Sequence, residues 1–175
     1  MSNILDSGNR REFGTGAVRD IQEGKGRCDL MPLDAVGTVL NIYYADNADN
    51  ADNEDVGATL MRLSHFRDTG NTGYLSMALG DFLDVSTYTC WSDLFLEVAK
   101  HFEEGAKKYG ENNWQKGIPT HCYIDSAVRH YLKWLRGDTD EPHDRAFCWN
   151  ILCCIWTCEH HPELNDYAKE KGGEE

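Results

Sequence analysis

Three stretches in the second half of the chain repeat apolar residues at the spacing of an α-helix, and they constrain the fold most. They cover residues 92–110, 119–136 and 141–161 of the 175-residue chain. Pro119 near the start of the second stretch and Gly137 after its end are typical helix boundaries. Because short connections join the three stretches, the sequence predicts an all-α helical bundle.

The first of these helices carries two different stripes. We expect Ser92 to be its N-cap and Gly110 to end it. Its apolar stripe, at spacings of three and four residues, consists of Phe95, Val98, Ala99, Phe102, Ala106 and Tyr109. A polar stripe beside it consists of Glu97, His101, Glu104 and Lys108, with Glu103 on the opposite flank.

The third helix is apolar on most of its circumference and should be the most buried of the three. The faces of the bundle are too apolar for a lone monomer of this size, because large exposed apolar patches usually mark association surfaces. We therefore expect further helices from a partner copy. The sequence predicts a homo-oligomer, either a dimer or a tetramer.

The remaining segments carry weaker signals. Residues 12–36 have scattered glycines and no sustained period, which indicates an irregular arm. Residues 38–44 are β-branched and aromatic, so they could form a short strand or an apolar strap. The Asp-rich repeat at 45–55 indicates a surface loop or disorder, with calcium binding as an alternative. We expect a short helix over 74–84 and a polar tail after Pro162 that frays.

The charge distribution argues against some classes of partner. The formal net charge is -13, and of four successive segments only residues 91–136 are not acidic, with seven Lys and Arg against six Asp and Glu. Such a surface disfavours a nucleic-acid duplex and favours a small phosphorylated ligand that brings its own divalent cation. No apolar run could span a membrane and no signal-peptide centre is found, so we expect a cytoplasmic protein without membrane contact.

The seven cysteines form neither a paired disulfide framework nor a CxxC metal motif. Four of them, at 148, 153, 154 and 158, lie in the third helix, where free thiols pack as small apolar groups. Zinc bound by these cysteines with His160 or His161 is the alternative that their spacing leaves open.

The acidic residues of the first helix and of the start of the third are candidate metal ligands. Hydrolysis of a nucleoside triphosphate requires Mg²⁺ or Mn²⁺ to neutralise phosphate oxygens and acidify the attacking water. In a bundle, carboxylates from facing helices can hold such an ion. The candidate ligands are Glu97, Glu103, Glu104, Asp140, Glu141 and Asp144, of which Glu103, Glu104, Glu141 and Asp144 are the candidate catalytic residues. The same carboxylates could instead pair with lysines or cap a helix N-terminus.

Positive and aromatic residues could bind the rest of a nucleotide. The candidate phosphate ligands are Lys107, Lys108, Arg129 and His130 at the helix ends, and Arg19, Lys25 and Arg27 in the arm. A base needs an aromatic surface with an amide that reads its edge, which Trp114 with Asn113, or Trp149 with Asn150, would supply. In the alternative reading the basic residues are solvated and Trp149 with Asn150 belongs to the core.

Four ordered blocks of the chain resemble the dATP/dGTP diphosphohydrolase family of bacteriophages, which has MazG-like members. The blocks are TGAVRD…GKGRCDLMP (15–32), HFEEGAKKYGENNWQKGIP (101–119), YIDSAVRHYLKWLRGDTDEPH (123–143) and WNIL (149–152). The resemblance implies a MazG-like all-α pyrophosphohydrolase fold, a divalent metal, and release of pyrophosphate from dGTP or dATP. In phages that replace adenine by 2-aminoadenine, such enzymes make dGMP, the precursor of the modified nucleotide.

The resemblance also adds His143 to the nucleotide-binding candidates and implies how the chain is organised. A single domain over 1–175 would consist of an N-terminal arm (12–36), an insertion (37–90), catalytic helices (91–161) and a polar tail (162–175).

One family motif is missing from the chain. Glu141 and Asp144 form an ExxD, but the first helix has no EExxE, which marks most MazG-like enzymes. A nucleotide-binding regulator or phage accessory protein that kept the bundle without catalysis is therefore the alternative to an enzyme.

Overall fold

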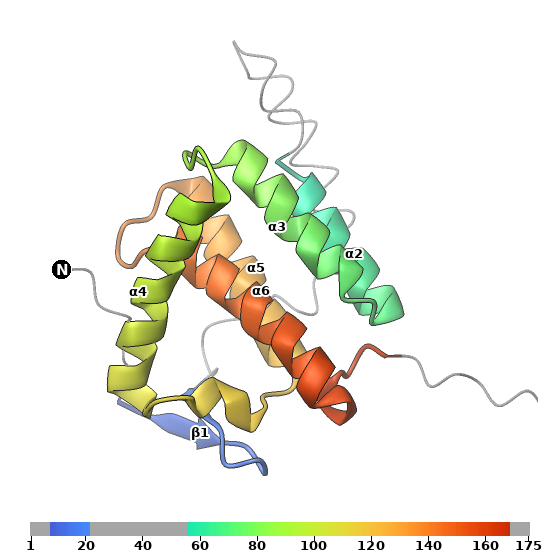
Figure 1. The fold of residues 1–175 in the computed structure, drawn as a ribbon, viewed down its shortest axis with the longest axis vertical. Coiled ribbons are helices and arrows are strands. Elements are labelled where there is room, and N and C mark those ends of the chain that lie inside the picture. Colours follow the sequence, from blue (N-terminus) through green and yellow to red (C-terminus); the bar gives the residue numbers. More distant parts are fainter. Residues whose placement is uncertain (1–7, 22–55, 169–175) are drawn as a thin grey trace, which may run out of the picture.

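The computed structural model describes residues 8–21 and 56–168, and its helices confirm the all-α prediction (Figure 1). The described helices are α2 (Ala58–Thr69), α3 (Gly73–Val85), α4 (Trp91–Tyr109), α5 (Thr120–Arg136) and α6 (His143–His160). Two 3₁₀ helices, η3 (Asn113–Lys116) and η4 (Pro162–Leu164), follow α4 and α6. The β-structure of these residues is one antiparallel pair, β1 (Arg10–Glu12) and β2 (Val18–Asp20). None of the described helices has the length and apolar character that a membrane crossing requires.

Helices α5 and α6 form the centre of the molecule. They lie side by side and the short segment 137–142 joins them (Figure 1). Gly137 ends α5 in the left-handed region at φ 79°, as its position in the sequence predicts. The prediction that the third helix is the most buried of the three is confirmed, because ten residues of α6 are buried, against eight of α5 and three of α4.

Helices α3 and α4 both pack against α6, and α2 packs against α3. The helix predicted over 74–84 is confirmed by α3, and its Phe82 lies against the rings of Tyr131, Trp134 and Phe147 with centroids 4.9 to 6.2 Å apart. Such aromatic contacts stabilise the core beyond the area they bury. The predicted insertion thus contributes two packed helices to the described structure.

Helix α4 buries a different face from the one the sequence predicts. It begins at Trp91 with Cys90 as the N-cap, so Ser92 is not the cap. Its buried residues are Leu94, Val98 and His101, whereas Phe95 and Ala99 of the predicted apolar stripe are exposed. The stripe is displaced because α4 packs mainly on α6.

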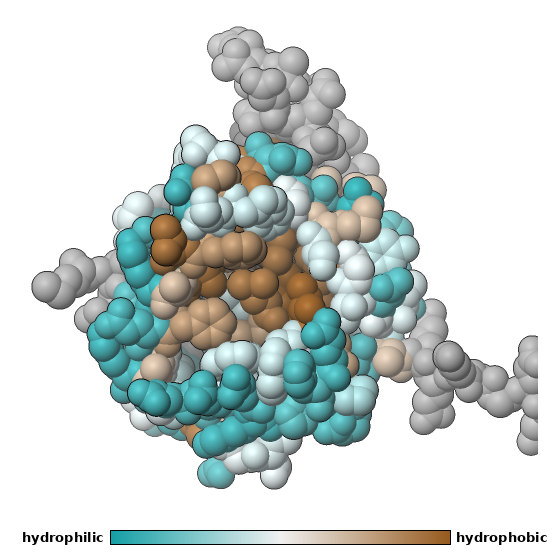
Figure 2. All heavy atoms as spheres, viewed as in Figure 1, coloured by the Kyte–Doolittle hydropathy of each residue, from teal (hydrophilic) through white to brown (hydrophobic). Residues whose placement is uncertain are grey.

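Because α4 buries a different face from the predicted one, part of its apolar surface is exposed to solvent. The large apolar side chains exposed in the described residues are Met77 (45%), Trp91 (40%), Phe95 (43%) and Leu96 (66%). Figure 2 shows apolar side chains gathered in a hollow between α4 and α6 on the side of the molecule that faces the viewer. An apolar area of this kind is typical of an association surface.

The start of the N-terminal arm is regular, where the sequence predicts an irregular segment. Strands β1 and β2 pair antiparallel, with Arg11 opposite Arg19 and Glu12 opposite Val18. The side chain of Asn113 supports the hairpin from η3, since its amide donates to the Val18 carbonyl (2.9 Å) and accepts from the Val18 N–H (3.1 Å). Three-residue strands carry too little periodicity for prediction, and here a side chain from a distant segment completes the ladder.

Residues 163–168 pack against the rest of the molecule, so the prediction of a frayed tail is wrong for them. Asp166 accepts hydrogen bonds from the His121 N–H (3.0 Å) and lies 2.7 Å from His121 Nδ1. Tyr167 packs edge-on against Phe66 of α2. These contacts hold the part of the segment that follows η4 to the core.

Some sequence predictions lie outside the described residues. They are the strand or strap at 38–44, calcium binding in the Asp-rich repeat, and the phosphate ligands Lys25 and Arg27.

Candidate active site

A cavity of about 910 Å³ opens between the β1–β2 hairpin, the second half of α4, η3, α5 and α6. Its size is within the range of small-molecule sites. Of the predicted nucleotide ligands it brings together Arg19, Asn113, Trp114, Arg129, His130 and Asn150. The predicted metal ligands Glu103 and Glu141 line it as well.

One face of α5 supplies the polar wall of the cavity. Its lining residues are Asp125, Ser126, Arg129, His130 and Lys133, which recur at spacings of one, three and four. Arg129 pairs with Asp125, and the Lys133 ammonium donates to Asp140 at 2.9 Å. The wall therefore combines fixed positive groups with carboxylates that hold them in place.

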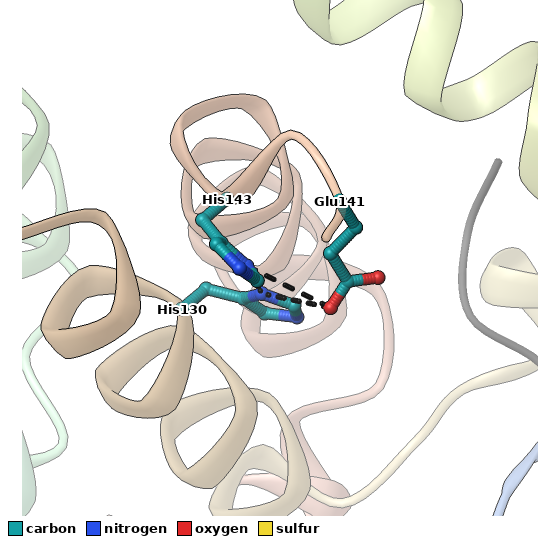
Figure 3. A group of neighbouring side chains, drawn as sticks. All are labelled: His130, Glu141 and His143. Atoms are coloured by element: carbon teal, nitrogen blue, oxygen red, sulfur yellow. Dashed lines mark hydrogen bonds and ion pairs between the residues drawn. The ribbon is translucent and has the colours of Figure 1, made fainter. Parts of the chain in front are cut away.

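Beside this wall, two histidines and one glutamate converge. The Nδ1 atoms of His130 and His143 lie 3.0 Å apart, and Glu141 Oε1 lies 3.5 Å from the first and 3.7 Å from the second (Figure 3). His130 is on α5, His143 begins α6, and Glu141 lies in the segment between them. Figure 3 shows both rings directed toward the same carboxylate. In the described part of the chain, this trio and the overlapping group of Asp138, Asp140 and His143 are the clusters that could hold a metal ion.

The two histidines are protected from solvent, and the side chain of His143 is 1% exposed. Burial holds the pKa of His130 well below its ordinary value, and the positive charges of neighbouring groups lower it further. His130 is therefore neutral at physiological pH, the state in which imidazole binds a metal. Next to it, the pKa of Asp140 is held below its ordinary range, first by the Lys133 ammonium and then by His143.

The opposite side of the cavity is aromatic. Phe102, Tyr109, Trp114 and Trp149 line it. Trp114 packs edge-on against Phe102 and Trp156, with centroids 5.4 and 5.0 Å away. Rings held in this way offer a flat apolar surface to a base.

Neither predicted edge-reading asparagine presents a vacant amide. Asn113 is 6% exposed and its amide is bound by Val18 of the hairpin. The Asn150 amide donates to the Ala146 carbonyl (2.8 Å), and its oxygen accepts from the Arg19 guanidinium (2.9 Å). Arg19 also donates to the Cys122 carbonyl at 3.1 Å. In this structure these three residues tie the hairpin to the core.

The acids of α4 do not meet those of the α5–α6 segment in one metal group within the described residues. Glu97 pairs with Lys100 and Glu103 with Lys107, both at the surface. Glu104 accepts from the Arg145 guanidinium at 2.8 Å. A metal site built by these glutamates stays a prediction. Within a single chain, such a site would require the glutamates to separate from their lysine and arginine partners.

Asp144, Lys107, Lys108 and His143 do not line the cavity. Asp144 accepts from the Tyr88 hydroxyl (2.6 Å) and the Arg145 N–H (2.8 Å), and it lies in the first turn of α6, where the helix dipole favours an acid. The Lys107 ammonium pairs with Glu103 on the surface, and the Lys108 ammonium lies 5.1 Å from the centre of the Tyr109 ring. His143 belongs to the cluster with His130 and Glu141.

Sequence reasoning missed Lys133 and gave no role to His101. Lys133 could have been found, because it follows Arg129 by four residues on the polar face of α5. His101 lines the cavity, and burial, with help from the Arg145 and Arg19 charges, lowers its pKa to about 4. Its ring packs 5.5 Å from that of Trp149. This buried position follows from the rotation of α4, which the apolar pattern does not reveal.

The cysteine alternative is not supported in the described residues, whose candidate metal groups include no cysteine. Cys148, Cys153 and Cys154 are buried in the core. Burial raises the pKa of each thiol well above its ordinary value, so these cysteines are neutral apolar groups.

Comparison with known proteins gives one finding. Residues 84–167 match the family model described as dATP/dGTP diphosphohydrolase, N-terminal. The match covers α4, η3, α5, α6 and η4, and with them most of the cavity wall. No curated protein and no solved structure matches the chain.

Proposed function

We propose that the chain hydrolyses purine deoxynucleoside triphosphates in the cavity beside α5, because residues 84–167 match the model of the dATP/dGTP diphosphohydrolase family. The products would be the deoxynucleoside monophosphate and pyrophosphate. One observation carries the proposal. The cavity, lined mostly by residues 84–167, has a cationic wall on one side and an aromatic surface on the other. A cluster able to hold a metal ion lies beside the cationic wall.

The metal-binding cluster and Trp114 lie toward different ends of α6, which gives the substrate a direction. The cluster lies at His143, at the start of α6, whereas Trp114 packs against Trp156, thirteen residues further on. At 1.5 Å per residue these positions are about 20 Å apart. We place the phosphates beside Arg129 and Lys133, and the base against Trp114 and Phe102.

The reaction would be attack of water on the α-phosphorus and rupture of its bond to the oxygen that bridges to the β-phosphate. Arg129 and Lys133 would hold the charge of the departing pyrophosphate. A divalent ion such as Mg²⁺ or Mn²⁺, when bound, neutralises phosphate oxygens and acidifies the water. Glu141 offers it a carboxylate oxygen on the cavity wall, so the chain fits a metal-dependent reaction.

We further propose that two or more copies associate through the apolar hollow of Figure 2. Trp91, Phe95 and Leu96 give α4 an apolar face next to its paired glutamates. A partner copy packed there could also bring a second set of acids close to Glu97 and Glu104, which is the assembly that the glutamate-ligand prediction needs.

The product suggests a place in metabolism. With dGTP as the substrate, the enzyme would supply dGMP in the cytoplasm of a phage-infected cell, as the precursor of a 2-aminoadenine nucleotide for genome synthesis. Removal of dATP by the same site would favour the modified base further.

The direct test is to incubate the full chain with dGTP and either Mg²⁺ or Mn²⁺ and to separate the products. We expect dGMP and pyrophosphate in equal amounts, and a preference for dGTP and dATP when all four dNTPs compete. Formation of dGDP and orthophosphate would refute the cleavage site. Tight dNTP binding by calorimetry with no turnover in any divalent metal would support the non-catalytic regulator instead.

A further inference from the structure

We infer that His130, Glu141 and His143 form a binding site for one divalent transition-metal ion, with Asp140 as the residue that orients His143. The inference deepens the proposed function, on which it rests only for the use of the ion in hydrolysis. Binding of the ion is a separate property and is measured separately.

The spacing of the three ligand atoms is the first argument. Nitrogen and oxygen ligands lie about 2.1 Å from such a metal, so neighbouring ligands are about 3.0 to 3.4 Å apart at octahedral or tetrahedral angles. The separations among His130 Nδ1, His143 Nδ1 and Glu141 Oε1 are 3.0, 3.5 and 3.7 Å. The triangle therefore needs adjustments of only a few tenths of an ångström to close around an ion.

A simple hydrogen bond explains only part of this arrangement. A proton shared by the two Nδ1 atoms accounts for their 3.0 Å contact. It does not account for Glu141 Oε1, because 3.5 and 3.7 Å are too long for a direct hydrogen bond to either ring. The two longer distances exceed the spacing of ligands around a shared ion by only a few tenths of an ångström.

Asp140 supplies the second argument. Its Oδ1 lies 2.7 Å from His143 Nε2. An imidazole that donates Nε2–H to this carboxylate keeps its lone pair on Nδ1, the atom that faces the cluster. A carboxylate behind a ligating histidine is a common arrangement at metal sites, where it fixes the orientation of the ring. Lys133 in turn holds the second Asp140 oxygen at 2.9 Å.

The kind of ligand selects the kind of metal. Two imidazole nitrogens with one carboxylate suit Mn²⁺, Fe²⁺, Co²⁺ or Zn²⁺, whereas Mg²⁺ and Ca²⁺ prefer sites made of oxygens. Three protein ligands leave positions open, as catalytic sites require. Since His130 and Glu141 line the cavity, those positions face the space proposed for the phosphates.

The test is titration of the chelator-treated full chain with Co²⁺, followed by visible absorption and by isothermal calorimetry, without nucleotide. We expect one equivalent of Co²⁺ to bind, with the absorption of a nitrogen-ligated ion, and a tenfold excess of Mg²⁺ should not displace it. His143→Gln and Glu141→Gln should each weaken binding by more than about 100-fold. Asp140→Asn should weaken it by about 10- to 100-fold while the spectrum of the saturated site keeps its nitrogen signature.

His65→Gln is the control, because His65 is an exposed histidine on α2. It should bind Co²⁺ as the parent chain does. Since His143 is buried, circular dichroism of each metal-free variant checks the fold, and the partly accessible Glu141 provides a second variant. Equal Co²⁺ affinity in the parent chain and in folded Glu141→Gln would overturn the inference, as would the absence of binding in the parent chain.

Binding and turnover separate the two proposals. If the parent chain binds Co²⁺ at these residues but releases no pyrophosphate from any dNTP, the metal site stands and the proposed function fails. If Mg²⁺-dependent hydrolysis of dGTP persists in folded Glu141→Gln that no longer binds Co²⁺, the function stands and this site is not its metal centre.

Discussion

The acids of α4 and those of the α5–α6 segment have the same chemistry but different neighbours. Glu97, Glu103 and Glu104 each contact a lysine or arginine. Asp140 and Glu141 lie beside histidines as well, Asp140 with His143 and Glu141 with both His130 and His143, and Lys133 also reaches Asp140. An acid that only pairs with a surface cation contributes to stability or solubility, whereas an acid grouped with imidazole nitrogens belongs to a set of atoms that can bind an ion.

This difference shows which acids of an acid-rich sequence are placed to bind a metal ion. Both regions look suited to a metal when only spacing is considered, since Glu97 and Glu104 lie two helical turns apart on one stripe and Glu141 and Asp144 lie three residues apart. The structure separates them by partner. The predictions below test that separation, from the largest expected effect to the smallest.

The largest effect should follow from Glu141→Gln. The exchange keeps the size of the side chain but removes the carboxylate charge that lines the cavity. We expect dGTP turnover to fall by roughly 10²-fold or more, because a metal that stabilises the transition state is worth several kcal/mol. Initial rates of pyrophosphate release, at saturating dGTP and metal, measure it.

Glu159→Gln on the exposed surface of α6 is the matched control, with the same exchange on a residue outside the cavity. It should retain the parent rate. If both variants keep that rate, Glu141 is no different from the solvated acids and the contrast between the two regions fails.

The second effect concerns stability and compares two neighbours on α4. Glu104 pairs with Arg145, whose side chain is only 6% exposed, while the Glu103 carboxylate is 65% exposed. Glu104→Ala should lower the free energy of unfolding by about 2 to 3 kcal/mol, since it leaves a buried guanidinium without its carboxylate. Glu103→Ala should leave it nearly unchanged, because an exposed pair contributes little.

Urea unfolding followed by circular dichroism measures both values on the same preparation. Equal losses for the two variants would show that the Arg145 pair is as dispensable as a surface pair. A loss only for Glu103→Ala would contradict the burial pattern of α4.

The bounds of the helices could be predicted from local sequence better than the contacts between them. Pro119 and Gly137 bound α5 where expected, and Gly110 ends α4, because these residues act on their own backbone. The hairpin could not be predicted, since its support comes from Asn113, about one hundred residues away. The exposed position of Phe95 could not be predicted either. The periodicity of apolar residues shows which side of a helix is apolar, but not which element packs against it.

The candidate site divides in the same way. Arg129, His130 and Glu141 were expected from residue type, and the cavity brings them together. Their grouping with His143 depends on the turn at 137–142, which the spacing does not specify. Which acids pair with cations depends on side-chain conformations, and alternatives of this kind stay open until the helices are placed.

A third, smaller effect is expected from a histidine–carboxylate contact outside both regions. His121 lies 2.7 Å from Asp166, and this hydrogen bond, with that to Cys122, raises the pKa of His121 to about 10 from an ordinary 6.5. Because the folded pKa is the higher one, the contact stabilises the fold fully below pH 6.5, and that stability is lost as the pH rises from 6.5 to about 10. His121→Asn should remove this part of the pH dependence.

Thermal melting of the parent chain and of His121→Asn at several pH values between 6 and 10 checks this prediction. The difference between their melting temperatures should shrink as the pH rises. His65→Asn provides the control, since exposed His65 lies outside this contact. A difference that stays constant across the range would mean that the ion pair does not form. The contact also adds to the comparison of the two acidic regions. A single histidine beside one acid, as at His121 and Asp166, is too few ligands to bind Co²⁺, so folded Glu141→Gln should not retain the ion there.

The smallest effect should come from Lys107→Ala at the exposed end of α4. Its ammonium pairs with Glu103, four residues earlier, and is 71% exposed. Pairs of this kind stabilise a helix by about 0.3 to 0.5 kcal/mol, and salt screens them. We therefore expect a loss of unfolding free energy below about 0.5 kcal/mol in dilute buffer, and none in 1 M salt, where the screening length is about 3 Å. Urea titrations at the two salt concentrations measure it. A loss above about 1 kcal/mol that salt does not reduce would mean that Lys107 makes a buried contact. The acids of α4 could then no longer be described as merely paired at the surface.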